Sequence, residues 1–142
     1  MPLTQDRRAE LIGACRLFHA LDERGLAAVA AVAVEVDFPA GRVIVRQGEI
    51  GTGFFVIVDG GVRIVRDGAS VARLGPGEFF GELSVLDGEP RVAQVIADAP
   101  TRCLALPSWD MERVLHDEPG VALSMLRVVA SRLREVTTDH RT

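Results

Sequence analysis

Residues 74–97 read LGPGEFFGELSVLDGEPRVAQVIA and interrupt a zone that is otherwise rich in strand-forming residues. Their centre, Glu82 to Leu86, contains good helix formers but has room for only one or two turns. Gly81 comes directly before this short helix, whose free N–H groups and positive dipole end would favour an anion. Arg91 follows a Gly-Glu-Pro loop, and a guanidinium matches phosphate oxygens two at a time. Glu82 supplies an acceptor suited to a sugar hydroxyl, so together these residues indicate a nucleotide site.

The zone around this stretch, residues 34–107, is rich in Val and Ile and is cut repeatedly by glycine. Residues 34–38 alternate strictly between apolar and polar, which is typical of a half-buried strand. Strands at 54–58 and 62–65 are predicted to form a hairpin around the turn at 59–61. Many short strands at this turn spacing favour a barrel, sandwich or jelly roll. Further turns are predicted at residues 39–41, 47–51 and 67–68.

Helical periodicity appears at both ends of the chain. In residues 5–33, apolar side chains recur every three or four positions, and Asp22 is the expected N-cap of a second helix. After the strands, a short helix is predicted over 109–116, with Ser108 as its expected cap. Pro119-Gly120 is expected to break the helical pattern after it. A longer helix is predicted over 121–136.

Two features of the C-terminal region, a tryptophan and an apolar stripe, lead to specific predictions about packing. Trp109 is expected to pack between its helix and the strands. The long helix carries an apolar stripe, and the sequence leaves open whether this stripe packs on its own domain or forms a dimer seam. The stripe consists of Ala122, Met125, Val129, Leu133 and Val136.

These elements predict one mainly β domain over residues 1–142, since this length and a hydrophobic content of 48% suit a single core. Its architecture is a β roll, a double-stranded β-helix or jelly roll, flanked by helices. Two N-terminal helices occupy about 5–33, the roll occupies 34–107 and includes the short helix, and C-terminal helices occupy 108–138.

Composition excludes several classes of protein. The net charge of -4 argues against a nonspecific nucleic-acid binder, which would carry a basic excess. The sequence contains no lysine, so any anion site must use arginine, histidine or backbone N–H groups. No apolar run reaches the roughly 18 residues of a membrane helix, so a cytoplasmic protein without membrane contact is expected. Cys15 and Cys103 are isolated in the sequence and are expected to be reduced, small apolar residues.

The residues do not support an enzyme. Residues 34–107 contain no histidine, so neither a metal site nor a metal-dependent β-roll enzyme is expected. Ser84 lacks a nearby histidine base and the Gly-x-Ser-x-Gly elbow of serine hydrolases. A plainer interpretation of Glu82 and Arg91 is a structural salt bridge across their loop.

Two short motifs resemble the phosphate-binding cassette of the cyclic nucleotide-binding domain family. They are Phe80-Gly81-Glu82-Leu83 and Pro90-Arg91-Val92-Ala93, and the resemblance places the cassette at residues 80–97. The family includes the regulatory subunit of cAMP-dependent protein kinase, the bacterial catabolite activators and cyclic nucleotide-gated channels. The likeness extends over most of the chain, because the helices and strands follow the order of the family.

The resemblance implies a role for each cassette residue. The backbone of Gly81 would lie near the ribose, and Glu82 would accept the ribose 2′-hydroxyl. Leu83 and Ser84 would offer backbone N–H groups to the cyclic phosphate, and Arg91 would neutralise its charge. The resemblance therefore makes the ligand a cyclic nucleotide that is bound and not transformed, with no further cofactor.

The resemblance also implies contacts to the base. Ala93, with Val71 and Leu74 from the β roll, would line the nucleotide wall. The last helix of the family folds over the base, and here Arg132 and Thr137 fall near the positions that touch the purine.

Two positions depart from the pattern of the family. Val92 stands where Ser, Thr or Ala is common, so no hydroxyl is available there, which favours cAMP over cGMP and leaves cGMP open. Gln94 stands where Thr is common. These departures keep a second hypothesis in view, a domain of the same fold that serves protein interaction alone.

The expected function is therefore a non-catalytic regulatory module that binds a cyclic nucleotide and transmits binding through its terminal helices. The resemblance to the bacterial activators adds a homodimer through the C-terminal helix as an open alternative. The downstream protein partner is unknown, and the chain by itself is not expected to contact nucleic acid. It is either a free-standing sensor or the effector domain of a longer catabolite activator-type transcription regulator.

Overall fold

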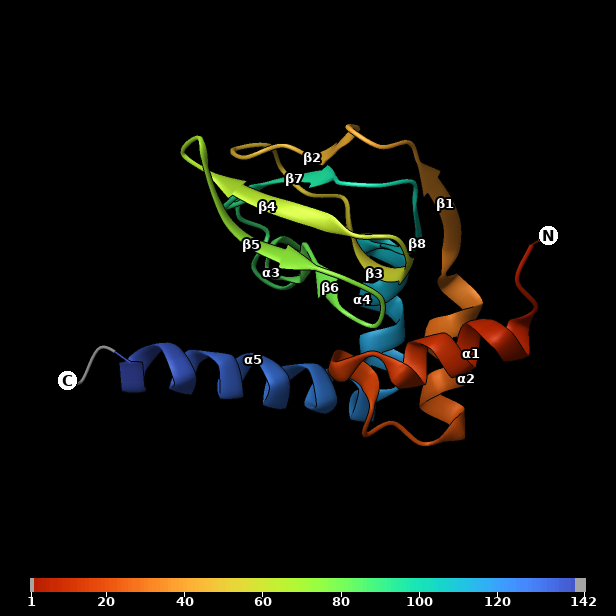
Figure 1. Ribbon diagram of the computed structural model, residues 1–142. Helices are drawn as coiled ribbons and strands as arrows, with labels where there is room; N and C mark the ends of the chain where they lie inside the picture. Colours follow the sequence, from red (N-terminus) through yellow and green to blue (C-terminus); the bar gives the residue numbers. More distant parts are fainter. Residues whose placement is uncertain (1, 140–142) are drawn as a thin grey trace.

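The computed structural model describes residues 2–139, in which two antiparallel sheets of four strands are flanked by helices at one end (Figure 1). The helices are α1 (Gln5–Ala14), the 3-10 turn η1 (Arg16–Phe18), α2 (Glu23–Val32), α3 (Glu82–Asp87), α4 (Ser108–Asp117) and α5 (Pro119–Asp139). The strands are β1 (Val34–Phe38), β2 (Val43–Val45), β3 (Gly53–Asp59), β4 (Val62–Arg66), β5 (Ala69–Leu74), β6 (Phe79–Phe80), β7 (Gln94–Ala97) and β8 (Thr101–Pro107). This arrangement confirms the predicted jelly roll with flanking helices.

The two sheets divide the strands in an order that local sequence does not show. One sheet has the order β1-β8-β3-β6 and the other β2-β7-β4-β5. The predicted hairpin between β3 and β4 is therefore wrong, because these strands belong to different sheets. The turn between them binds a distant loop instead: Asp98 N donates to Gly61 O at 3.0 Å, and Thr101 Oγ1 donates to the same oxygen at 3.0 Å. Asp59-Gly60-Gly61 thus carries the chain from one sheet to the other.

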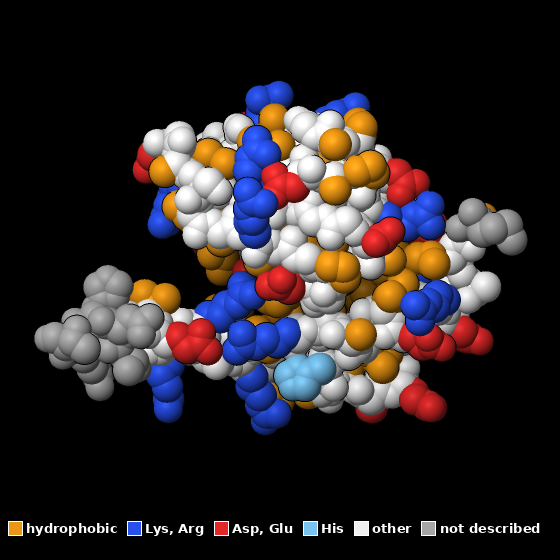
Figure 2. Space-filling model, in the orientation of Figure 1, with side chains coloured by type: hydrophobic (Ala, Val, Ile, Leu, Met, Phe, Trp, Pro, Cys, Tyr) orange, Lys and Arg blue, Asp and Glu red, His pale blue; other side chains and the backbone are white. Residues whose placement is uncertain are grey.

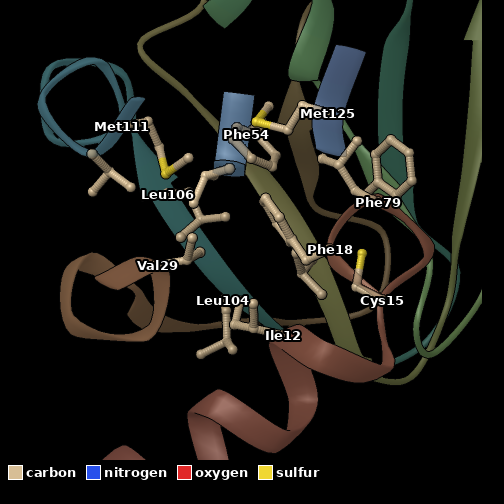
Figure 3. Close-up of a cluster of buried hydrophobic side chains, with 14 of the residues drawn as sticks. Ile12, Cys15, Phe18, Val29, Phe54, Phe79, Leu104, Leu106, Met111 and Met125 are labelled. Atoms are coloured by element: carbon tan, nitrogen blue, oxygen red, sulfur yellow. The ribbon is translucent and has the colours of Figure 1, made fainter. Parts of the chain in front are cut away.

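The hydrophobic core has two parts. The larger part fills the space between the helices and the β1-β8-β3-β6 sheet, where Figure 3 shows side chains such as Phe18 and Phe54 pointing into a common interior. The rings of these two residues lie 6.2 Å apart between centroids. The smaller part lies inside the roll, where Phe55 stacks on Phe80 at 5.1 Å. The helices are thereby held against one sheet, while the other sheet remains free to form a wall of a cavity.

The start of α4 differs from expectation. Ser108 does not cap the helix but is its first residue, after Pro107, and its hydroxyl oxygen is buried without a hydrogen-bond partner. The side chain of Trp109 is 66% exposed, so the expectation that it packs against the roll is wrong. Strand β8 ends at Pro107 and runs directly into α4, so Pro107 takes the N-cap position, and Ser108 N donates to Thr52 O at 2.8 Å.

The boundary between the C-terminal helices is also shifted. Pro119 and Gly120 do not separate the helices but begin α5, with only Glu118 between α4 and α5. Proline is tolerated in the first turn of a helix because the N–H group that it lacks has no partner there. The longest helix therefore starts two residues earlier than Val121.

Helix α5 has two apolar faces. Val121, Met125 and Val128 are buried in the core, whereas the side chains of Leu126 and Leu133 remain largely exposed. The predicted stripe therefore combines one core residue, Met125, with two half-buried residues, Ala122 and Val129, and two exposed residues, Leu133 and Val136. In Figures 1 and 2 the end of α5 projects beyond the roll. No helix in the described residues is long and apolar enough to cross a membrane.

Candidate functional site

A cavity of about 180 Å³ opens between the β2-β7-β4-β5 sheet, the loop that contains α3, and α5. It brings together nine of the residues singled out from the sequence. These are Leu74, Gly81, Glu82, Leu83, Ser84, Arg91, Val92, Ala93 and Arg132. Apolar side chains from the strands complete the wall, namely Val45, Ile64, Phe79, Phe80 and Val95.

Two residues expected at the site do not line this cavity. Val71 lies on β5 where the register of the β4–β5 pair is irregular, and its side chain is 52% exposed and does not line the cavity. Thr137 is exposed on α5, where its hydroxyl donates to Leu133 O at 2.9 Å on the same helix. Gln94 begins β7 and is also absent from the wall.

The start of α3 depends on glycine for two reasons. Gly81 is the N-cap, with a φ of 89° that side chains other than hydrogen disfavour. A Cβ at this position would also lie only 2.3 Å from Nη1 of Arg91. Since glycine has no side chain to cap the helix, the N–H groups of the first turn are left for another acceptor.

Arg91 is buried at the floor of the cavity, with 8% of its surface exposed. Its Nη1 donates to Gly81 O at 3.0 Å, and its Nη2 donates to Gly53 O at 2.6 Å. No carboxylate in residues 2–137 lies within ion-pair distance of this guanidinium. Burial lowers the pKa of Arg91, although an arginine remains charged at neutral pH. The site thus contains a buried positive charge held by neutral carbonyl groups.

Glu82 is the second buried charge, and its partner comes from α5. Nη1 of Arg132 lies 3.2 Å from Oε1 of Glu82, and the guanidinium of Arg132 lies 4.3 Å from the centroid of the Phe79 ring. Burial raises the pKa of the Glu82 carboxyl, while the charges of Arg132 and Arg91 oppose this shift. The plainer interpretation of Glu82 and Arg91 as a salt bridge across the loop is wrong, because Glu82 pairs with Arg132 instead.

Other chemistry has little support in the described residues. No group of three or more His, Cys, Asp or Glu side chains there is placed to hold a metal ion. Both cysteines are buried, and burial raises the pKa of the Cys15 thiol to about 11 and that of Cys103 to about 12. Thiols of this kind stay protonated at neutral pH and are poor nucleophiles.

Sequence reasoning missed two glycines that contact Arg91. Gly53 supplies a carbonyl to the guanidinium, and Gly51 lies against its flat face. Neither residue carries a side chain, and they lie about forty positions before Arg91, so only the glycine-rich turn itself could have drawn attention to them.

Several curated bacterial proteins are similar to this chain. The "CRP-like cAMP-activated global transcriptional regulator" of Mycobacterium tuberculosis is 29% identical over 135 residues, which cover 92% of this chain and 60% of that protein. The "Cyclic AMP receptor protein" of Thermus thermophilus is 36% identical over 107 residues, which cover 72% of this chain and 50% of that protein. The chain therefore spans only half to three fifths of the length of these relatives.

A solved structure and a family model are also similar to this chain. The N-terminal domain of a transcriptional regulator from Streptomyces coelicolor A3(2) has a TM-score of 0.79 and 34% identity, with 93% of this chain and 96% of that chain covered. The profile described as "Cyclic nucleotide-binding domain" matches residues 35–118, more than half of the sequence. Since this match includes the whole cavity loop and both sheets, the chain belongs to the cyclic nucleotide-binding domain family.

Proposed function

We propose that this chain is a non-catalytic sensor that binds a cyclic nucleotide, with cAMP as the preferred ligand. The observation that carries this proposal is Arg91, a buried guanidinium with no carboxylate partner in the described chain that faces a largely apolar cavity. A buried charge is costly unless a counter-charge is supplied. The single negative charge of a cyclic phosphate supplies it.

The remaining groups of the cavity fit the rest of such a ligand. The N–H groups of Leu83 and Ser84 would share the phosphate with Arg91, and the carboxylate of Glu82 would accept from the ribose hydroxyl. The apolar wall, which includes Leu74 and Ala93, would cover one face of the base. Covering such a face gains about 25 cal/mol per Å² of apolar surface removed from water.

The contact between Glu82 and Arg132 gives binding a route to α5. A ribose hydroxyl that donates to the Glu82 carboxylate would share the group that Arg132 now holds. The position of α5 relative to the cavity is therefore coupled to occupancy, as a population shift requires. Arg132 is proposed as this link, because its guanidinium already bridges α5 to both Glu82 and Phe79.

Titration calorimetry with cAMP and with cGMP tests the proposal. We expect both to bind, with a lower dissociation constant for cAMP because Val92 offers no hydroxyl to a guanine amino group. The competing hypothesis, a domain of this fold that serves protein interaction alone, predicts no heat of binding for either nucleotide. Because two of the relatives named above are described as transcriptional regulators, the output is proposed as transcription control from the cytoplasm, by a free-standing sensor or as one part of a longer regulator.

Val92→Thr is expected to shift nucleotide preference towards cGMP. Val92 lines the cavity with a largely exposed side chain, so that a threonine hydroxyl there fits without displacing the core. One added hydrogen bond contributes about 0.5–1.5 kcal/mol, which changes the ratio of the two dissociation constants roughly two- to tenfold. Calorimetry with both nucleotides measures this ratio, and Val92→Ala is the control for lost side-chain volume. An unchanged ratio would show that this position does not distinguish the two bases.

Glu82→Gln is expected to stabilise the ligand-free protein at neutral pH while weakening nucleotide binding. Burial raises the pKa of Glu82 above its value in the unfolded chain, so the folded state binds this proton more tightly. The stability contributed by this group is therefore present at acid pH and is lost as pH rises through the raised pKa. The Tm of Glu82→Gln should exceed that of the wild type at pH 7, and the difference should shrink at pH 4. Glu89→Gln, at an exposed position of the same loop, should show neither effect.

We also propose a homodimer through the exposed face of α5. Leu126, Val129, Leu133 and Val136 follow one another at spacings of three and four, which is the a/d pattern of a two-stranded coiled coil. Leu126 and Leu133 are more than 60% exposed. A second copy of α5 would cover both leucines. The same helix would then contact the partner subunit through this face and the nucleotide cavity through Arg132.

A further inference from the structure

We propose that Gly51 is a positioning residue for Arg91, a role that rests on the proposed function of Arg91 in binding the cyclic phosphate. The structure leaves no space for a side chain at this position. A Cβ at residue 51 would lie 2.5 Å from Cζ, 2.7 Å from Nε and 2.8 Å from Nη2 of Arg91. These atoms form the flat face of the guanidinium, so the glycine backbone serves as the surface on which Arg91 rests.

Glycine is required at residue 51 because a side chain would clash with Arg91, and not because of its backbone conformation. Seven other glycines of the described chain have a positive φ, but Gly51 does not. An alanine at residue 51 could therefore adopt the same backbone, and only the contact with Arg91 would oppose it. Gly81 approaches the same guanidinium through Nη1, so that Arg91 lies in a slot with glycine on two sides.

The turn that contains Gly51 is bound to Arg91 by its backbone. Arg91 N donates to Glu49 O at 2.8 Å, and Gly48 N donates to Arg91 O at 2.8 Å. Ile50 forms an isolated bridge with Pro90. The turn and the backbone of Arg91 are therefore held together, and neither can withdraw easily from an added methyl group.

The free end of the arginine is thus the part that would move. A methyl group at residue 51 is expected to push the guanidinium away from the carbonyls of Gly53 and Gly81, which now fix its direction. The fold should persist, because the displaced atoms are the far end of a flexible side chain. The charge, however, would no longer meet the phosphate with two N–H groups at once.

We expect Gly51→Ala to weaken cAMP binding about tenfold, with the loss caused by Arg91→Ala as the upper limit. Adenosine, which lacks the phosphate, should bind Gly51→Ala and the wild type equally. Gly75→Ala is the matched control, because a Cβ there meets no atom within 4 Å and its φ is not in the left-handed region. Calorimetry with both ligands and thermal denaturation of each variant measure these effects.

A double-mutant cycle with Arg91→Ala separates positioning from a general effect. If Gly51 acts through Arg91, Gly51→Ala should not weaken cAMP binding further once Arg91 is alanine. If Gly51→Ala lowers the Tm, the double variant should recover it, because the clash is removed. Equal cAMP affinity of Gly51→Ala and wild type would overturn the inference, as would the same fold-loss in both backgrounds.

A measurement on the ligand-free protein tests the role of Gly51 independently of the proposed nucleotide binding. A wild type that binds no cyclic nucleotide would defeat the proposed function alone. The position of the guanidinium could still be followed in the ligand-free protein by the NMR resonance of Arg91 Nε–H. A resonance that shifts in Gly51→Ala but not in Gly75→Ala supports the positioning role, and one that is unchanged in both contradicts it.

Discussion

Replacing Arg91 with alanine is expected to lower the affinity for cAMP by one to two orders of magnitude. A charge-assisted hydrogen bond contributes about 1.5–3 kcal/mol, and each 1.4 kcal/mol corresponds to a factor of ten. The effect should lie at the upper end of this range, because the guanidinium is buried and has no carboxylate partner in the described chain. Its interaction with an anion is therefore weakly screened by water.

Two further substitutions, one that keeps the positive charge at residue 91 and one at a neighbouring arginine, make this experiment more specific. Arg91→Lys should recover only part of the affinity, because an ammonium group cannot donate to two phosphate oxygens in the planar geometry of a guanidinium. Arg46→Ala is the control, since Arg46 belongs to the neighbouring turn, is mostly exposed and does not line the cavity. Calorimetry measures the affinities, and circular dichroism checks that each variant is folded. If Arg91→Ala bound cAMP as tightly as the wild type, the assignment of the phosphate site would be wrong.

Leu133→Asp is expected to dissociate the proposed α5 dimer. Burying a leucine contributes about 1.5–3 kcal/mol, and a two-fold interface contains the residue twice. The dimer dissociation constant should therefore rise by roughly two to four orders of magnitude. Light scattering over a dilution series measures the mass. Ser131→Asp, which adds the same charge at an exposed position outside the a/d seam, should leave it unchanged.

Arg132, which precedes Leu133 in the sequence, tests the face of α5 that lines the cavity. Arg132→Gln removes the ion pair with Glu82 and should weaken cAMP binding without changing the mass. A chain that ends at Val129 loses both Leu133 and Arg132, so it should be monomeric and bind cAMP more weakly. Unchanged mass and unchanged affinity of this truncated protein would show that the end of α5 is inert packing, and the proposed route from ligand to output would fail.

The predictions that held depend mostly on residues close in the chain, although the local predictions of a cap at Ser108 and of a helix end at Pro119-Gly120 were wrong. Gly81 and Glu82 are adjacent, and a glycine before a short helix is decided by local dihedral angles and N–H groups. Asp22 caps α2 through Gly25 N, three residues further on, which is again a local hydrogen bond. Turn spacing and the alternation of apolar residues predicted a barrel, sandwich or jelly roll, because these patterns record the period of each strand.

Only the tertiary structure determined which residues distant in the chain contact one another. Asp59-Gly60-Gly61 favours a turn, but whether that turn closes a hairpin or crosses between sheets depends on the loop at 98–101 that binds it. Glu82 could have paired with Arg91, yet the packing of α5 brings Arg132 to it. Gly51 has no side chain to reveal its role, which exists only because folding places Arg91 against its backbone. Local sequence encodes the elements of this site, whereas the surface that each element meets is set by the packing of segments far apart in the chain.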